Sequence, residues 1–299
     1  MHSMIPRRRI APFIAIGGAL WLWSAVSVSA QAPPAAPQAP PGGGGGGRGG
    51  GGRGGGGGAP AAQNAQTAAP IDLTGYWVAL VTEDWLYRMR TPEKGDMDQS
   101  VPMSQAARQA AMNWDPAKDE AAGEQCKAYG AAAIMRVPTR LHITWENENT
   151  LKVETDAGTQ TRLLHFGGQP PATGDAGWQG YSVASWDGAG GGRGGRAGGG
   201  GAPQNAAAGG PAPIRPGSLK VVTTNMKSGY IRKNGVPYSA ATRMTEYFDR
   251  VNEPNGDTLL IVAATTEDPQ YLTQPFLTST HFKKEPDGSK WSPSACSAR

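Results

Sequence analysis

Residues 140–166 read RLHITWENENTLKVETDAGTQTRLLHF, and this stretch decides the fold class. Leu141 and Ile143 alternate with polar residues, which places the apolar side chains on one face of a β-strand. Turn-forming residues at 147–149 and 157–158 divide the stretch into three short strands. The pattern therefore predicts consecutive β-hairpins with one buried face.

Period-two alternation recurs along the chain on both sides of this stretch. A helical pattern covers Ser104 to Trp114, where Ser104 is a typical N-cap, alanines fill the interior and Asp115-Pro116 ends the run. Because consecutive hairpins lose their exposed edges when the sheet closes, we predict an all-β fold: a lipocalin-like up-and-down antiparallel β-barrel with one short helix. The predicted strands cover 75–82, 84–90, 140–146, 151–155, 159–166, 181–186, 219–226, 241–251, 258–265 and 276–281.

Three segments lack the composition of a folded domain. Residues 1–30 combine a basic start, an apolar run and a Val-Ser-Ala site ending at Ala30, which predicts a cleaved secretory signal peptide. Residues 31–70 and 189–217 are rich in Pro, Ala, Gln and Gly, with too few apolar side chains to offset the entropy of ordering. We therefore expect one domain, 71–299, after a disordered linker and interrupted by a disordered glycine-rich insertion.

The net charge of +4 describes the whole chain and not the predicted domain. Eight of the 28 Lys and Arg residues lie in the signal peptide, linker and insertion, which have no acidic residue. The domain thus has 20 basic and 24 acidic side chains, a net charge of −4. An acidic domain does not favour nucleic-acid binding. The Arg-Gly runs are compatible with RNA-binding tails, but export favours a flexible spacer.

Cys126 and Cys296 are the two cysteines of the chain. In the oxidising compartment that a signal peptide implies, an even count favours a disulfide between them. His142, His165 and His281 remain after signal removal and lack the spacing of a metal site. The chain also lacks the nucleophile elbow of serine hydrolases and the glycine fingerprints of nucleotide sites, so we expect no metal and no cofactor.

The tetrapeptide Thr74-Gly75-Tyr76-Trp77 opens the first predicted strand. It resembles the Gly-x-Trp signature of lipocalins and related calycin barrels. That resemblance implies a structural role for Trp77, which would plug the closed end of the barrel. Lipocalins usually stack an arginine near the last strand on this tryptophan, and here Lys283 and Lys284 occupy that region.

The chain is more similar to an uncharacterised group of exported bacterial proteins with a lipocalin-like barrel. The resemblance implies the fold and export, and it brings no reaction with it. Members of that group tend to end in an acidic segment around a cysteine, whereas this chain ends in a Ser-Ala-Cys-Ser segment around Cys296. The stretches that carry the resemblance are 234–239, 245–251, 267–271 and 274–275.

Glu246 is the most informative single residue, because alternation places it on the same strand face as Met244 and Phe248. A carboxylate on an apolar face must be paired, hydrogen-bonded or protonated, and Arg140 and Arg162 are candidate partners. One hypothesis is a polar anchor or general acid/base inside a cavity. The alternatives are a structural ion pair, or a bulge that turns the side chain outward.

Our leading functional hypothesis is a periplasmic or secreted lipocalin-like protein that binds a small, largely apolar ligand in the barrel cavity. One alternative is an enzyme of hydrolase or isomerase type, with Glu246 and Asp268 as acid/base groups and Tyr247 or Tyr271 as hydrogen-bond donors. Another is a carbohydrate-binding or envelope-associated module tethered by the Gly/Pro-rich arm. The candidate ligand-binding residues are Glu246, Tyr247, Tyr271, Trp186, Arg140 and Arg162.

Overall fold

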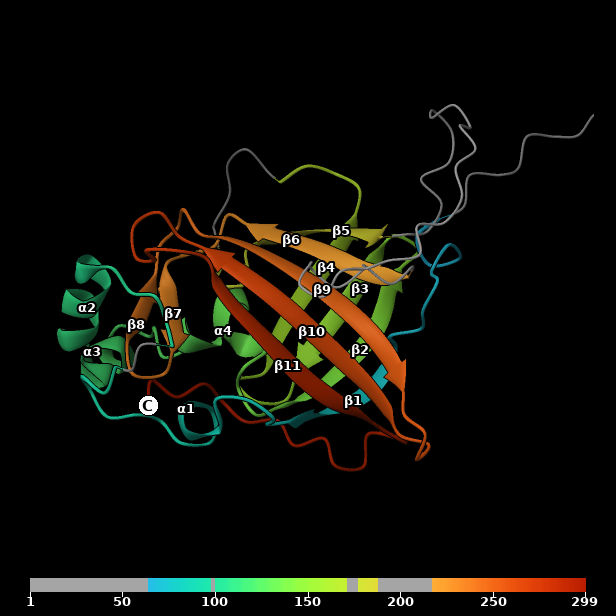
Figure 1. Cartoon of the computed structure of the whole chain (residues 1–299), viewed down its shortest axis with the longest axis horizontal. Coiled ribbons are helices and arrows are strands. Elements are labelled where there is room, and N and C mark those ends of the chain that lie inside the picture. The colour runs from blue at the N-terminus through green and yellow to red at the C-terminus, as the bar shows by residue number, and fades with distance from the viewer. Residues whose placement is uncertain (1–63, 98–99, 171–176, 188–216) are drawn as a thin grey trace, which may run out of the picture. The chain divides into compact units, whose positions relative to one another are not determined.

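The computed structural model describes residues 64–97, 100–170, 177–187 and 217–299 (Figure 1). The predicted signal peptide, most of the predicted linker and nearly all of the predicted insertion therefore lie outside the described residues.

A closed barrel of nine strands forms the centre of the described structure (Figure 1). Each strand follows the alternation that the sequence predicts, with one face buried and the other partly exposed. Because the barrel is closed, β1 pairs with both β11 and β2. The order of neighbouring strands is β1-β11-β10-β9-β6-β5-β4-β3-β2. The strands are β1 (Gly75–Leu80), β2 (Arg140–Asn147), β3 (Thr150–Thr155), β4 (Gln160–Phe166), β5 (Tyr181–Asp187), β6 (Ser218–Thr224), β9 (Arg243–Asn252), β10 (Thr258–Glu267) and β11 (Phe276–Glu285).

The barrel is mixed, which corrects the expectation of an up-and-down antiparallel topology. β4 and β5 are parallel neighbours, with Leu164 opposite Ser182, while the other neighbouring pairs are antiparallel. A parallel pair needs a connection long enough to return the chain to the same end of the sheet. Residues 167–180 provide that length, and strand alternation alone carries no information about the direction of such a return.

Four α-helices and a 3₁₀-helix accompany the barrel, where the sequence predicted one helix. The predicted helix is α2 (Gln105–Met112), and the hydroxyl of Ser104 accepts a hydrogen bond from the Ala107 N–H at 3.2 Å, as an N-cap does. Asp115-Pro116 both ends this helical run and starts α3 (Pro116–Ala121), because proline fits the first turn of a helix. Two further elements are η1 (Lys127–Tyr129) and α4 (Ala131–Ile134), and the fifth, α1 (Trp85–Met89), precedes α2 in the chain.

The segment 84–90, predicted as a strand, is instead the helix α1 (Trp85–Met89). Asp84 starts it in the left-handed region, with φ of 49°. The prediction was wrong because a tertiary contact decides the conformation of this segment. Nε of Arg88 donates to the carbonyl of Arg136, in a distant part of the chain, at 2.9 Å. The segment itself has only a weak preference between helix and strand.

A separate hairpin, β7 (Gly229–Arg232) and β8 (Val236–Tyr238), interrupts the barrel sequence between β6 and β9. The sequence analysis assigned no strand to it. The turn between the two strands contains Asn234-Gly235, and Gly235 has φ of +84°. A Cβ at position 235 would lie 2.3 Å from the side chain of Trp114, so both the backbone and the packing require glycine there.

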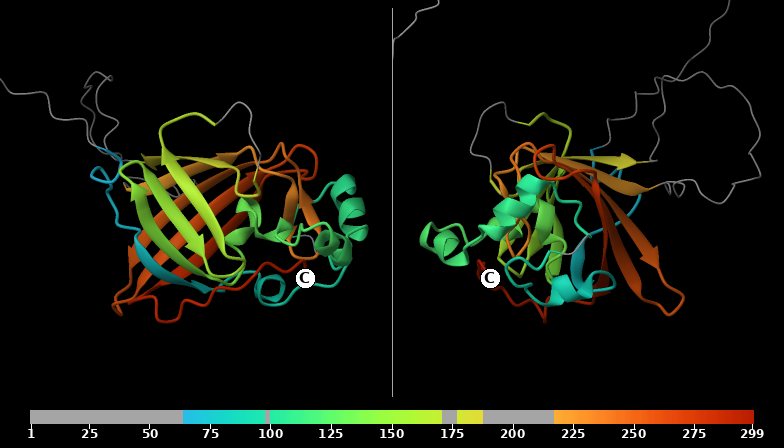
Figure 2. Two further views of the ribbon diagram at one scale, coloured as in Figure 1. Left: turned by 180° about the vertical axis from the view of Figure 1, so that it is seen from behind. Right: turned by 60° about the vertical axis from the view of Figure 1, so that its left-hand side comes forward.

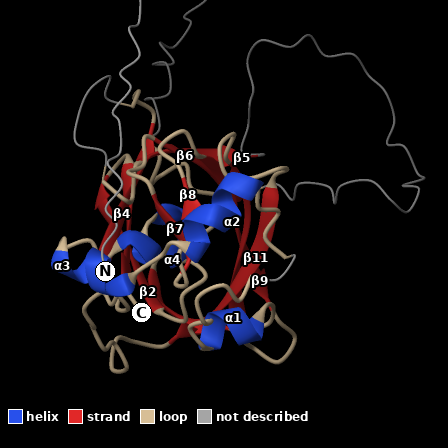
Figure 3. Ribbon diagram, turned by 90° about the vertical axis from the view of Figure 1, so that its left-hand side faces the viewer, coloured by secondary structure: helices blue, strands red, loops and turns tan. Residues whose placement is uncertain are grey.

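The hairpin and the helices α2, α3, η1 and α4 lie at one end of the barrel, and we call them the cap (residues 104–138 and 229–238). Figure 3 looks onto this end, where α4, β7 and β8 lie across the opening and α2 and α3 lie further out. Figure 2 shows the same arrangement from two other sides. Within the cap, α2 packs on β8, while η1 and α4 pack on β7.

Trp77 is fully buried inside the barrel, as its resemblance to the lipocalin tryptophan implies. Its indole N–H donates to the carbonyl of Leu73 at 2.9 Å, and the ammonium of Lys284 lies 4.4 Å from its ring centroid. Lys284 therefore lies over the Trp77 ring, where lipocalins usually have an arginine.

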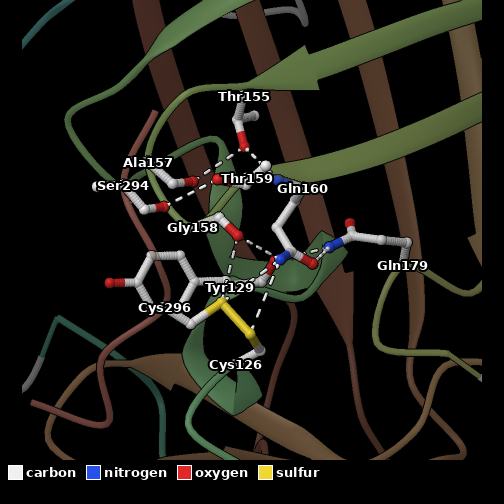
Figure 4. Close-up of a disulfide and its surroundings, with 10 residues drawn as sticks. All are labelled: Cys126, Tyr129, Thr155, Ala157, Gly158, Thr159, Gln160, Gln179, Ser294 and Cys296. Atoms are coloured by element: carbon white, nitrogen blue, oxygen red, sulfur yellow. Dashed lines mark hydrogen bonds between the residues drawn. A yellow bond between two sulfur atoms is a disulfide. The ribbon is translucent and has the colours of Figure 1, made fainter. Parts of the chain in front are cut away.

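Cys126 and Cys296 form the disulfide that the sequence predicted (Figure 4). The C-terminal segment reaches it by returning along the outside of the barrel, where the Ser294 N–H donates to the carbonyl of Asp156 at 2.9 Å. Gly158 lies beside the bridge with φ of +74°, and a Cβ there would lie 2.3 Å from the ring of Tyr129. The disulfide thus ties the start of η1 in the cap to the C-terminal segment.

Candidate functional site

Glu246 lies inside the barrel, on the face predicted from the alternation of β9, and it pairs with Arg162 of β4. The pair is bidentate: Arg162 Nη1 and Nη2 donate to the two carboxylate oxygens at 3.1 and 2.6 Å. Arg162 also reaches the hydroxyl of Thr223, which forms a hydrogen bond of 2.7 Å with Ser182. Both charged side chains are 1% exposed, so the ion pair belongs to the barrel interior.

Packed side chains fill the barrel around this pair. Thirteen apolar side chains of the described strands expose 4% of their surface or less, and partly buried side chains such as Trp145, Phe166 and Trp186 pack against them. The described interior around Glu246, where the sequence predicts a ligand, is lined by closely packed side chains. The thirteen side chains are Trp77, Leu141, Ile143, Leu151, Val153, Leu164, Ala184, Leu219, Val221, Phe248, Leu260, Val262 and Phe282.

Asp268 follows β10 and organises the loop that leads to β11. Its carboxylate accepts hydrogen bonds from the Ser239 N–H at 2.5 Å, the Thr242 hydroxyl at 2.8 Å and the Gln270 N–H at 2.8 Å, with further bonds from the Ser239 hydroxyl and the Tyr271 N–H. Burial acts to raise the pKa of Asp268, but these donors outweigh it and the pKa is lowered. At neutral pH the Asp268 carboxylate is ionised, and both of its oxygens accept hydrogen bonds from these donors.

Arg140 and Tyr247 lie away from Glu246. Arg140 binds Glu285 on the neighbouring side of the barrel at 3.1 Å. Tyr247 alternates with Glu246 along β9 and is half-buried on the outer face, where Lys220 lies 5.8 Å from its ring centroid.

Trp186 lies at the end of the barrel opposite the cap. It packs against Phe166 and Trp145, with ring centroids 5.1 and 6.5 Å away. Its indole N–H donates to the carbonyl of Ala65 at 2.8 Å, so the chain just before the barrel lies against this aromatic cluster.

Two predicted ligand-binding residues line open clefts in the described structure. Arg140 borders a cleft of about 320 Å³ beside β1 and the C-terminal segment, and Tyr271 borders a second cleft at the cap. This second cleft has a volume of about 280 Å³ and lies between α2–α3 and the hairpin β7–β8; we call it the cap cleft. Its aromatic lining is Trp114, Tyr230, Tyr238 and Tyr271, and its charged lining includes Asp119 and Lys127. Aromatic walls with a few fixed polar groups are typical of small-molecule sites.

Three polar groups of the cap cleft form a fixed network. The ammonium of Lys127 lies 2.8 Å from one oxygen of Asp119, and the Tyr230 hydroxyl donates to the other oxygen at 2.8 Å. Burial acts to lower the pKa of Lys127, but its bonds to Asp119 and Glu124 outweigh burial and raise it. Burial, together with the bond to Asp119, raises the pKa of Tyr230. The cleft therefore presents a cation and a protonated phenol across the neutral pH range.

Two aromatic residues of the cap cleft carry buried polar atoms without a hydrogen-bond partner. These atoms are Nε1 of Trp114 and the hydroxyl of Tyr238. Each unmade hydrogen bond costs about 1–3 kcal/mol.

The sequence analysis missed most of the cap cleft. Asp119 and Lys127 lie in a stretch without a recognisable period, and no spacing links them to Tyr230. Tyr238 falls in the stretch 234–239 that carries the family resemblance, which was the available signal for this region. The cleft arises from tertiary packing of α2 and α3 on the hairpin.

Comparison with protein-family models, with curated proteins and with solved structures finds no match for this chain. The closed nine-stranded barrel is compatible with a calycin-like fold. Within the described residues no three His, Cys, Asp or Glu side chains are grouped to hold a metal ion. None of the helices in the described ranges has the length and apolarity needed to cross a membrane.

We predict that Glu246→Gln lowers the free energy of unfolding by about 3–5 kcal/mol, because it leaves Arg162 charged and unpaired in a packed interior. The double variant Arg162→Met/Glu246→Leu should recover most of that loss. Urea unfolding of the single and double variants measures both. The control is Glu267→Gln, which removes an exposed pair with Arg243 and should cost less than about 1 kcal/mol. A stable Glu246→Gln protein that has lost a ligand would instead make Glu246 a ligand anchor.

We predict that Asp268→Asn destabilises the protein by about 2–4 kcal/mol at pH 7, because an amide presents N–H groups to N–H and O–H donors. Since folding lowers the pKa of Asp268, the stabilisation is present above its unfolded value of 3.8 and is lost as the pH falls through the folded value. The difference in unfolding free energy between the wild type and the variant should therefore shrink below pH 3.8. A difference that is independent of pH down to pH 2 would contradict this.

Proposed function

We propose that this chain is an exported ligand-binding protein that holds a small amphipathic molecule in the cap cleft. The observation that carries the proposal is the lining of the cleft: four aromatic residues around the Asp119–Lys127–Tyr230 network in a volume of about 280 Å³. That volume is close to the lower end of the range for small-molecule sites, about 300–1,000 Å³. The barrel interior around Glu246 is a less favourable place for the ligand because the side chains there are buried and packed together.

The chemistry of the cleft defines the class of ligand. Aromatic rings of Tyr230 and Tyr271 favour a flat or ring-shaped apolar part. The ammonium of Lys127, held beside Asp119, favours an acceptor or anionic substituent at one edge of the ligand. The best candidate is therefore a small ring compound with a carbonyl, hydroxyl or acidic group.

The same geometry favours binding over catalysis. The carboxylates of the enzyme alternative, Glu246 and Asp268, are each occupied by several donors, and Glu246 has no exposed surface. Asp119 in the cleft is likewise held by Lys127 and Tyr230. A general acid or base must be within reach of the substrate proton that it transfers. The envelope-associated alternative depends on the Gly/Pro-rich arm, most of which lies outside the described residues, and stays a prediction.

The test is a substitution that fills the cleft. Ala110 on α2 lines the cap cleft, whereas Ala106 on the same helix is exposed and does not line it. We predict that Ala110→Trp weakens binding of the dye 8-anilinonaphthalene-1-sulfonate at least about tenfold, a loss of roughly 1.4 kcal/mol. The matched control Ala106→Trp should bind the dye as the wild type does. Fluorescence titration gives the three dissociation constants.

Native mass spectrometry of the exported protein identifies the natural ligand as a small molecule that co-purifies with the protein. A small molecule that co-purifies with the wild type and with Ala106→Trp, but not with Ala110→Trp, would support the cap cleft. Equal dye binding by all three proteins would contradict the proposal, because the dye would then bind elsewhere.

A further inference from the structure

The helix α1 presents its side chains in an unusual direction. Trp85, Leu86 and Met89 are exposed by 67%, 43% and 62%, while Arg88 between them is 7% exposed. A surface helix normally buries its apolar side chains and exposes its charges. Arg88 points inward, so a favourable interaction with its guanidinium is needed to offset the cost of burying this charge.

Arg88 points into a cluster of buried cations. Arg136, which follows α4, is 9% exposed, and Arg232 at the end of β7 is 5% exposed. Arg136 binds Glu83 at 2.9 Å and also Asp84, and Arg232 binds Asp84 at 3.1 Å. Glu83 and Asp84 thus hold two of the arginines in place on neighbouring parts of the cap.

Arg88 itself has no such carboxylate bond. Its Nε donates to the carbonyl of Arg136, and both terminal nitrogens are buried without a hydrogen-bond partner. Arginine does not lose its proton in proteins, so deprotonation cannot relieve this burial. Burial and the nearby charge of Arg136 both lower the pKa of Arg88, as expected for a cation in unfavourable surroundings.

A small cavity adjoins this cluster. Its volume is about 40 Å³, and its lining combines Arg88, Arg136, Arg232 and Lys233 with apolar side chains such as Val137 and Ile231. One water needs about 10–15 Å³ measured in this way, so the cavity has room for a small polyatomic group. It is distinct from the cap cleft, because the two share no lining residue.

We propose that this cavity is a carboxylate-binding site, in which Arg88 holds a planar oxyanion through its two terminal nitrogens. The parallel N–H groups of a guanidinium match the two oxygens of a carboxylate. Arg136 and Lys233 add positive charge at the walls, and the apolar side chains suit the carbon part of a small acid. The site takes either a free small carboxylic acid or the acidic end of a larger ligand.

The experiment titrates sodium acetate into the full exported protein at constant ionic strength, with sodium chloride as the balancing salt. We expect a saturable rise in melting temperature and saturable broadening of the [¹³C]acetate NMR signal for the wild type. Arg88→Met should lose both effects, and Arg90→Met, an exposed arginine two residues away, should keep them. Ala110→Trp should keep them too, which separates this site from the cap cleft.

Arg88→Lys serves where Arg88→Met fails to fold, and its affinity for acetate should fall at least about tenfold because lysine lacks the planar fork. Absence of saturable acetate binding by the wild type would overturn the proposal without any variant. Equal binding by the wild type and the Arg88 variants would overturn it as well, since acetate would then bind elsewhere. Saturation by inorganic phosphate alone would overturn the assignment to carboxylates.

Discussion

The Cys126–Cys296 disulfide is the constraint on which the cap depends. The cap elements are short: α4 has four residues, η1 has three and β8 has three, and elements of this length do not hold their geometry alone. The disulfide joins the start of η1 to the C-terminal segment, which is itself attached to the barrel through Ser294 and Asp156. Gln160 of β4 adds to this anchor, because its amide donates to the carbonyl of Gly158 at 2.6 Å and accepts from Gln179 at 3.0 Å (Figure 4). The disulfide thus adds a covalent anchor to the packing of Tyr129, Ile134 and Met135 of the cap against the barrel core.

The barrel acts as a scaffold for this cap. The Arg162–Glu246 pair crosses the barrel interior and connects β4 and β9, which are separated in the barrel by β5 and β6. A bidentate buried pair of this kind favours one arrangement of the strands, because any other leaves charges unpaired. The loops at the cap end can then carry binding groups while the strands stay constant, as in other folds whose function lies in connecting segments. Two such places have separate linings: the cap cleft around Lys127 and the arginine-lined cavity around Arg88.

The sequence predicted the parts of this structure that local pattern governs. Alternation in 140–166 located β2, β3 and β4, and alternation around Glu246 placed its carboxylate inside with Arg162 as one of two candidate partners. Three features were wrong or missed because tertiary contacts decide them. The direction of β5 depends on the connection 167–180. The helix α1 depends on the contact between Arg88 and Arg136. The cap cleft depends on the packing of α2 and α3 on a hairpin whose strands are too short to show a period in the sequence. Asp268 was predicted only as a candidate acid/base group, and its five hydrogen-bond donors come from positions that no spacing rule connects.

Amide hydrogen exchange of the Cys126→Ser/Cys296→Ser variant tests most directly whether the disulfide fixes a functional cap on an independent barrel. Exchange reports the local opening free energy, so a cap released from its anchor should differ from the strands. The account predicts that amides of η1, α4 and β7 exchange at least about tenfold faster than in the wild type, while amides of β2, β3 and β10 keep their protection. Binding of the dye to the cap cleft should weaken in parallel. Unchanged protection of the cap, or an equal loss of protection in the cap and in β2, β3 and β10, would contradict the account.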